Sequence, residues 1–188
     1  MAPWSRAALL CVSLLLAAAG GDGARASMCL TTAGVADGQW WRLVTAHFMH
    51  LSWPHTLLNV MGVLGCCALV PAVFDRLLVL RITALSVAIS LFLLIGSPHA
   101  LPYMGLSGIL YALLVLGLAP LARNDRIAAS ILAGVTIWMA WQWVVGPVAS
   151  EERMIGGRIV ASAHVYGYVS GAAWLLMRAF FTSRRAHP

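Results

Sequence analysis

Long apolar stretches, separated by short polar segments, limit what this chain can fold into more than any other feature. Six stretches occur, at about residues 4–20, 54–73, 77–96, 104–121, 127–147 and 158–181. Each approaches the length of about 20 mostly apolar residues that a helix needs to cross a bilayer. Only 10% of the residues are charged, whereas about a quarter are charged in a soluble domain. The sequence predicts an all-α polytopic membrane protein with six transmembrane helices in one domain, residues 1–188. It argues against a soluble fold and against nucleic-acid binding.

The arginines predict how these helices are oriented. All 12 basic residues are Arg, and the net charge is +6. With the N-terminus inside, eight arginines fall at cytoplasmic ends and four fall on the outer side. Because positive residues favour the cytoplasmic side, we expect an N-in/C-in arrangement with both termini in the cytoplasm. The first stretch has a second interpretation as a cleavable signal peptide, since Arg6 and Ala24-Arg25-Ala26 match that pattern.

The segment 21–53 is too rich in aromatic residues to be a plain connection. Trp40, Trp41 and Trp53 occur in it or at its end, and tryptophan favours the headgroup level of a membrane. We therefore expect an outer interfacial loop that lies against the bilayer, on its outer side, and braces the helix bundle.

Several polar side chains interrupt the apolar stretches. Those in the second, fourth and sixth stretches are His55, Asn59, Ser107, Tyr111 and His164. These three stretches all run from outside to inside, so their polar residues fall in one outer layer of the membrane. Because burying polar groups costs energy, they predict a single polar cavity open to the outer face. Arg81 and Gln142 are further exceptions, interpreted as a snorkelling side chain near a span end and an interfacial side chain.

Ser107 lies between two glycines in Gly105-Leu106-Ser107-Gly108, where the fourth stretch begins. A serine hydroxyl becomes a good nucleophile when a base takes its proton, and His164 is the candidate base. A residue in the first helical turn has a free backbone N–H, so the Ser107 amide can stabilise an oxyanion together with Asn59 and His55. No Asp or Glu lies within any stretch, so a Ser-His dyad fits better than a triad.

Two glycines after His164 predict how this residue reaches Ser107. Gly167 and Gly171 are four residues apart, and small residues at this spacing make a flat helix face for close packing. We expect this face to bring the sixth stretch against the fourth. Tyr111 lies one turn beyond Ser107, and we expect its ring to stack on the imidazole.

These residues resemble the motifs of the rhomboid intramembrane serine proteases. The similar motifs are Trp41-Arg42, the set His50, His55 and Asn59, the run Gly105–Gly108 with Tyr111, and Ala163-His164 with Gly167 and Gly171. The resemblance covers about residues 38–175. It implies a six-span rhomboid-like bundle in which Ser107 is the nucleophile and His164 the general base. It also implies that His55, Asn59 and the Ser107 amide bind the oxyanion, and it requires no cofactor or metal.

Within that family, the small size and the run WWRLVTAHFMHLSWPHTLLN look most like the rhombosortases. Those bacterial enzymes process proteins that carry a C-terminal Gly-Gly membrane anchor. The resemblance implies a membrane-anchored, exported protein as substrate. It also implies an inner-membrane location with the active site open to the periplasm. Hydrolysis and transfer to another nucleophile both stay open.

Two other functions remain open from the sequence. A catalytically inactive relative would bind transmembrane helices without cutting them. A small metal or haem protein would use the cluster of His47, His50 and His55. Their loose spacing and the lack of a nearby acidic or Cys ligand argue against a metal site. His47 matches no motif and has no assigned role.

Overall fold

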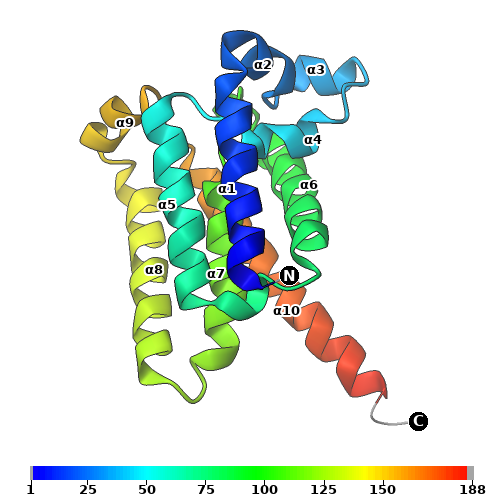
Figure 1. The fold of residues 1–188 in the computed structure, drawn as a ribbon, viewed down its shortest axis with the longest axis vertical. Coiled ribbons are helices and arrows are strands. Elements are labelled where there is room, and N and C mark those ends of the chain that lie inside the picture. The colour runs from blue at the N-terminus through cyan, green and yellow to red at the C-terminus, as the bar shows by residue number, and fades with distance from the viewer. Residues whose placement is uncertain (1, 186–188) are drawn as a thin grey trace.

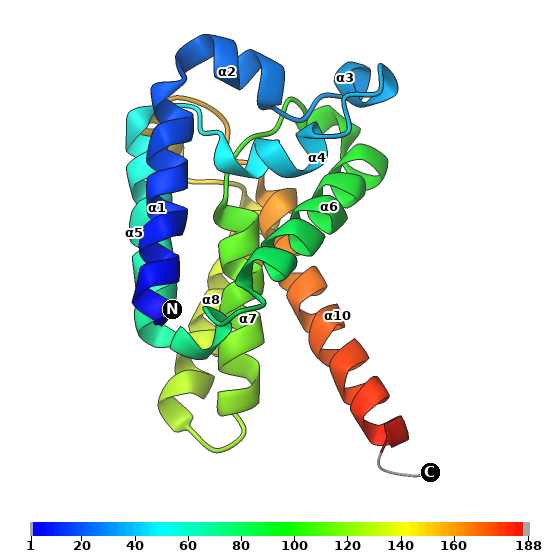
Figure 2. The same ribbon diagram turned by 45° about the vertical axis from the view of Figure 1, so that its right-hand side comes forward.

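The computed structural model describes residues 2–185, and within this range the chain is helical and contains no strand. Six helices fall on the six predicted stretches: α1 Pro3–Ala19, α5 Trp53–Leu69, α6 Leu78–Gly96, α7 Ser107–Leu121, α8 Arg126–Val145 and α10 Ala161–Arg185. Helix α7 is central, and most of its residues are buried. Figures 1 and 2 show the other long helices around it, with the C-terminal part of α10 projecting from the bundle.

Fewer helices are long and apolar enough to cross a membrane than the six that the sequence predicts. Among the described residues, α6 and α8 are each long and apolar enough to cross a membrane. Helix α1 and the short helix α2, Gly21–Met28, pass the same test together, but they are bent by 107°. Helices α5 and α7 are apolar but have only 17 and 15 residues. The six-span count and the N-in/C-in orientation therefore stay predictions.

The segment predicted as an interfacial loop forms several short helices. They are α2, α3 Thr32–Ala36, α4 Arg42–Thr45 and the 3₁₀ turn η1 Ala46–Phe48. Helices α2 to α4 gather at one end of the bundle together with α9, Ala149–Ile155, at the top of Figure 1. Helix α9 was not predicted, because Glu151 and Glu152 mark its stretch as a polar connection.

Arg42 holds this end of the molecule together. Its Nη1 donates to the carbonyl oxygens of Ala26 and Cys29 at 3.0 and 2.6 Å, and its Nε donates to the Gln39 side chain at 2.6 Å. The neighbouring Trp41 donates from Nε1 to the Ser27 carbonyl oxygen at 3.2 Å. Trp41 and Arg42 thus tie the start of α4 to the end of α2.

His47, which had no assigned role, joins η1 to α6. It is fully buried, and its Nε2 donates to the carbonyl oxygen of Ser86 at 3.1 Å. The same nitrogen lies 3.1 Å from Ser90 Oγ, and that hydroxyl donates onward to the Leu43 carbonyl oxygen at 2.8 Å. Burial lowers the pKa of His47 to about 4, so this histidine is a neutral structural link.

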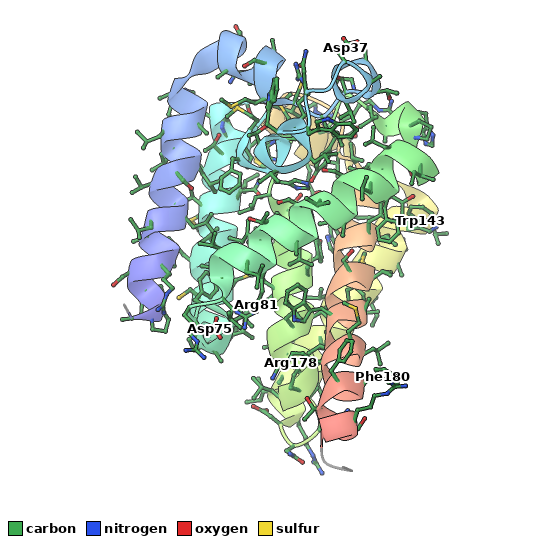
Figure 3. The ribbon with its side chains drawn as sticks, turned by 90° about the vertical axis from the view of Figure 1, so that its right-hand side faces the viewer. Asp37, Asp75, Arg81, Trp143, Arg178 and Phe180 are labelled. Atoms are coloured by element: carbon green, nitrogen blue, oxygen red, sulfur yellow. The ribbon has the colours of Figure 1, made fainter. Side chains whose placement is uncertain are left out.

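The interpretation of Arg81 as a snorkelling side chain was wrong. Arg81 is only 6% exposed, because it turns inward to Asp75 in the turn before α6 (Figure 3). Its Nη1 donates to Asp75 Oδ1 and to the Val73 carbonyl oxygen at 2.7 and 2.8 Å, and its Nη2 donates to Asp75 Oδ2 at 3.0 Å. These hydrogen bonds from Arg81 lower the pKa of the Asp75 carboxyl.

Helices α7 and α10 pack backbone against backbone. A Cβ atom on Gly171 would lie 2.7 Å from the Ala112 carbonyl oxygen, and one on Gly108 would lie 2.7 Å from the Ala163 carbonyl oxygen. A Cβ on Gly167 would collide directly with the Gly108 carbonyl oxygen. Only glycine permits this approach, and the close contact sets the spacing between the residues that α7 and α10 carry.

Candidate active site

Ser107 is the first residue of α7, and the backbone before it has an unusual shape. Gly105 has φ +140°, a conformation that residues with a side chain rarely adopt. Its N–H donates to the Ala46 carbonyl oxygen at 3.1 Å, and its own carbonyl accepts from the Tyr103 hydroxyl at 2.7 Å. The segment before α7 is thereby fixed to η1, and the Ser107 N–H, at the helix start, has no intrahelical partner.

The Ser107 hydroxyl meets His164 across the α7–α10 contact. Ser107 Oγ lies 2.9 Å from His164 Nε2, although the two residues are 57 positions apart. The His164 side chain is buried. The structure thus brings together the two residues that the sequence proposed as nucleophile and base.

Gln142 is the residue that the sequence interpretation missed. It was assigned to the membrane interface, but it is 3% exposed, and its Oε1 lies 3.1 Å from His164 Nδ1. The signal was present in the sequence as a lone amide within an apolar stretch, like Ser107 and His164 in theirs. Periodicity alone did not show that this face of α8 turns inward.

Tyr111 covers one side of the His164 ring. The two ring centroids are 4.8 Å apart and the planes are inclined by 38°. Tyr111 comes from the turn of α7 that follows Ser107, as expected from its spacing. The imidazole is therefore held by a ring contact from α7 and by polar contacts at both of its nitrogens.

His55 lies at the edge of this cluster with a defined proton position. Its Nδ1 accepts a hydrogen bond from the Leu51 N–H at 3.3 Å. In a neutral imidazole the other nitrogen then carries the proton. That Nε2–H is near Gly105, where an added Cβ would lie 3.3 Å from it. The ring of His50 packs edge-on against His55, with centroids 4.9 Å apart.

Asn59 is less free than the sequence suggested. Its Nδ2 donates to the His55 carbonyl oxygen at 3.0 Å, one turn earlier in α5. Its Oδ1 is buried and has no hydrogen-bond partner among the described residues. A side-chain amide has two N–H donors, so one remains after the contact with His55.

The cavity that reaches Ser107 differs from the polar cavity that was predicted. It has a volume of about 460 Å³ and lies between α5, α7 and α8. Its lining is mostly apolar, with Gly62, Gly65, Tyr111, Gly134 and Trp138 among its residues. Of the polar residues that we expected in one cavity, Ser107 and Tyr111 line it. The other three, His55, Asn59 and His164, are not among its lining residues.

The three histidines near α5 do not converge. His47 faces α6, whereas His50 and His55 contact each other. Within residues 2–185, no group of three or more His, Cys, Asp or Glu side chains has a metal-binding arrangement.

The chain was compared with known protein families, and one family model matches most of it. A family model described as the Rhomboid domain matches residues 37–180. The matched range begins just before α4 and ends within α10, so it contains every residue of the Ser107–His164 cluster. A search of curated proteins finds no match.

Proposed function

This chain belongs to the rhomboid family, whose members are intramembrane serine proteases, and from that premise we propose that it is an active serine endopeptidase. It would cut a transmembrane segment or a C-terminal anchor of an exported protein. The observation that carries the proposal is the 2.9 Å approach of Ser107 Oγ to His164 Nε2. A hydroxyl within hydrogen-bond reach of an imidazole is the arrangement that nucleophilic catalysis needs.

The proposed reaction begins with attack of Ser107 Oγ on the scissile carbonyl carbon. As the new C–O bond forms, the hydroxyl proton moves to His164 Nε2, and the carbonyl electron pair becomes an oxyanion. His164 then gives this proton to the leaving amine as the C–N bond breaks. Water attacks the acyl-enzyme with His164 again as base, which releases the acid product and restores Ser107.

Three donors are available for the oxyanion. The Ser107 N–H is free at the helix N-terminus, where the helix dipole also favours negative charge. The geometry at Leu51 supports a proton on His55 Nε2, and Asn59 retains one N–H after its contact with His55. Preorganised donors of this kind supply a large part of the rate enhancement in acyl transfer.

The cavity supports access from the side. Ser107 faces the space between α5 and α8, and both helices present glycines to it. A substrate helix must unwind before its peptide bonds are reachable, so weak helix formers such as glycine are expected at the cut. A Gly-Gly anchor of the rhombosortase type satisfies this requirement, and we propose such an anchor as the substrate. We place the protein in a bacterial inner membrane with the site on the periplasmic side.

A serine-directed phosphonate probe tests the proposed activity. The purified wild-type protein in detergent should be labelled, and both Ser107→Ala and His164→Ala should lose labelling. Mass spectrometry should find the adduct on Ser107. Labelling that persists in Ser107→Ala would remove the proposed nucleophile. A folded wild type that stays unlabelled would point instead to a rhomboid-like protein that binds transmembrane helices.

A further inference from the structure

Helix α8 is joined to α10 by two polar contacts, although most of its surface is exposed. Its buried residues are Ala128, Met139 and Gln142. Gln142 Oε1 lies 3.1 Å from His164 Nδ1, and Thr136 Oγ1 lies 2.9 Å from the Tyr168 hydroxyl. An amide buried in an apolar helix is unfavourable unless it is hydrogen-bonded. Of these two contacts, only the one at Gln142 reaches the imidazole beside Ser107.

We propose that Gln142 is a positioning residue for His164, which selects the ring tautomer that can act as a base. The inference rests on the proposed protease function and adds a third member to the Ser107–His164 pair. The amide oxygen of Gln142 accepts a hydrogen bond from the N–H at His164 Nδ1. The lone pair on Nε2 then faces the Ser107 hydroxyl, which donates to it.

The tautomer matters because a neutral imidazole carries a proton on only one nitrogen. With the proton on Nε2, the ring presents a donor to Ser107 and has no lone pair there to take the hydroxyl proton. Tyr111 contacts the face of the ring, so it restrains the ring plane without distinguishing the two nitrogens. Among the described residues, Gln142 is the hydrogen-bond partner at Nδ1.

The amide must also be oriented correctly for this role. With the oxygen toward Nδ1, His164 has a donor at Nδ1 and an acceptor at Nε2, and both contacts are satisfied. The reverse orientation would turn the amide N–H toward Nδ1 and force the ring proton onto Nε2. The 2.9 Å contact would then have to run from the ring to Ser107. The first arrangement is the one that supports proton transfer from Ser107.

Three variants separate positioning from simple helix packing. Gln142→Met keeps the length and apolar bulk of the side chain but cannot accept the hydrogen bond well. Gln142→Glu retains an acceptor oxygen whether or not it is protonated. Tyr168→Phe removes the other polar contact between α8 and α10, a hydrogen bond to Thr136 that does not involve His164. Each is measured by its rate of Ser107 labelling with the phosphonate probe, and by ¹⁵N NMR of histidine-labelled protein, with His164 assigned from His164→Ala.

We expect the wild-type His164 ring to carry its proton on Nδ1 and to lose this preference in Gln142→Met. Labelling by Gln142→Met should fall about tenfold, the factor that corresponds to one net hydrogen bond. Gln142→Glu should recover most of the rate, and Tyr168→Phe should remain close to wild type.

Two results would overturn the assignment to Gln142. One is a wild-type His164 ring that carries its proton on Nε2. This measurement uses the wild-type protein alone, so it does not depend on whether a variant folds. The other is an equal loss of labelling in Tyr168→Phe and Gln142→Met, since that would assign the effect to the attachment of α8. A wild type that shows the Nδ1 proton but is never labelled at Ser107 would remove the protease function, while the hydrogen bond to Gln142 would stand.

Discussion

The two sides of α7 are built in opposite ways. Toward α10, glycines bring the backbones into contact, and a Cβ at Gly167 has no space. Toward α5 and α8 there is a cavity, and a Cβ at Gly65 or Gly134 would meet nothing within 4 Å. The Ser107–His164 contact spans the tight side, and Ser107 faces the open side. A nucleophile and base need a fixed separation, whereas a polypeptide substrate needs room, and α7 provides both on opposite faces.

The largest effect is expected from Gly167→Ala, which adds a methyl group on the tight side. Because its Cβ collides with the Gly108 carbonyl oxygen, α7 and α10 must separate. Overpacking against the backbone is expected to cost about 3 kcal/mol of stability, and the separation of Ser107 from His164 should abolish labelling. Thermal unfolding in detergent and labelling by the phosphonate probe measure the two effects.

Gly134→Ala is the matched control on the open side. Its Cβ meets nothing, and alanine is favoured over glycine in a helix by about 0.5–1 kcal/mol. We expect equal or slightly higher stability. If Gly134→Ala destabilised the fold as much as Gly167→Ala, the contrast between the two sides would be lost.

At the start of α5, His55→Ala should reduce the turnover rate and leave the fold intact. Loss of one strong oxyanion donor lowers turnover by about 10²- to 10³-fold. The residue lies at the start of α5, outside the α7–α10 contact, so the unfolding temperature should change little. Cleavage of a membrane-anchored substrate and a melting curve on the same preparation decide this. Unchanged turnover would exclude His55 from the oxyanion site.

A smaller effect is expected from Asp75→Asn, in the turn before α6, a helix that packs against α10. Hydrogen bonds from Arg81 lower the pKa of the Asp75 carboxyl. The folded carboxyl therefore binds its proton less readily than the unfolded one. Its contribution is complete above the unfolded pKa of about 3.9 and is lost as pH falls through the lower folded value.

For Asp75→Asn we expect a loss of about 1 kcal/mol at neutral pH, as for a partly exposed ion pair. The variant and wild type should converge in stability as the pH falls below about 4. Unfolding measured from neutral pH to below about pH 4 gives the stability loss at neutral pH and the pH at which the two proteins converge. A difference that persists at the lowest pH would mean that the Asp75 charge is not what stabilises α6.

The positions of the helices were predictable from the sequence because membrane-length apolar stretches have few other conformations. The stretch at 77–96 became α6, Leu78–Gly96, within one or two residues. The meeting of Ser107 and His164 was also accessible, since Gly167 and Gly171 mark a face that only a close neighbour explains. In the first case the information is one run of apolar residues, and in the second it is the spacing of two glycines within α10.

The errors arose where nothing within a polar residue's own helix points to its partner. Arg81 is paired by Asp75 in the turn before its helix, and Gln142 by His164 on another helix. Helix periodicity does not say which neighbour a face will meet. A polar residue near a span end looks the same whether it reaches outward to headgroups or inward to a partner.

The choice of an amide at Gln142 has a consequence for biogenesis. A carboxylate in a membrane-spanning helix is costly to insert as a charge, by about 2.5–3.5 kcal/mol for an Asp at the helix centre. Gln142, His164 and Ser107 can all enter as uncharged groups. In the proposed reaction, positive and negative charge then arise together on the imidazole and the oxyanion and vanish together. These three side chains can therefore insert into the bilayer without the cost of a charge. Charge separation at the site arises only while a peptide bond is being cut.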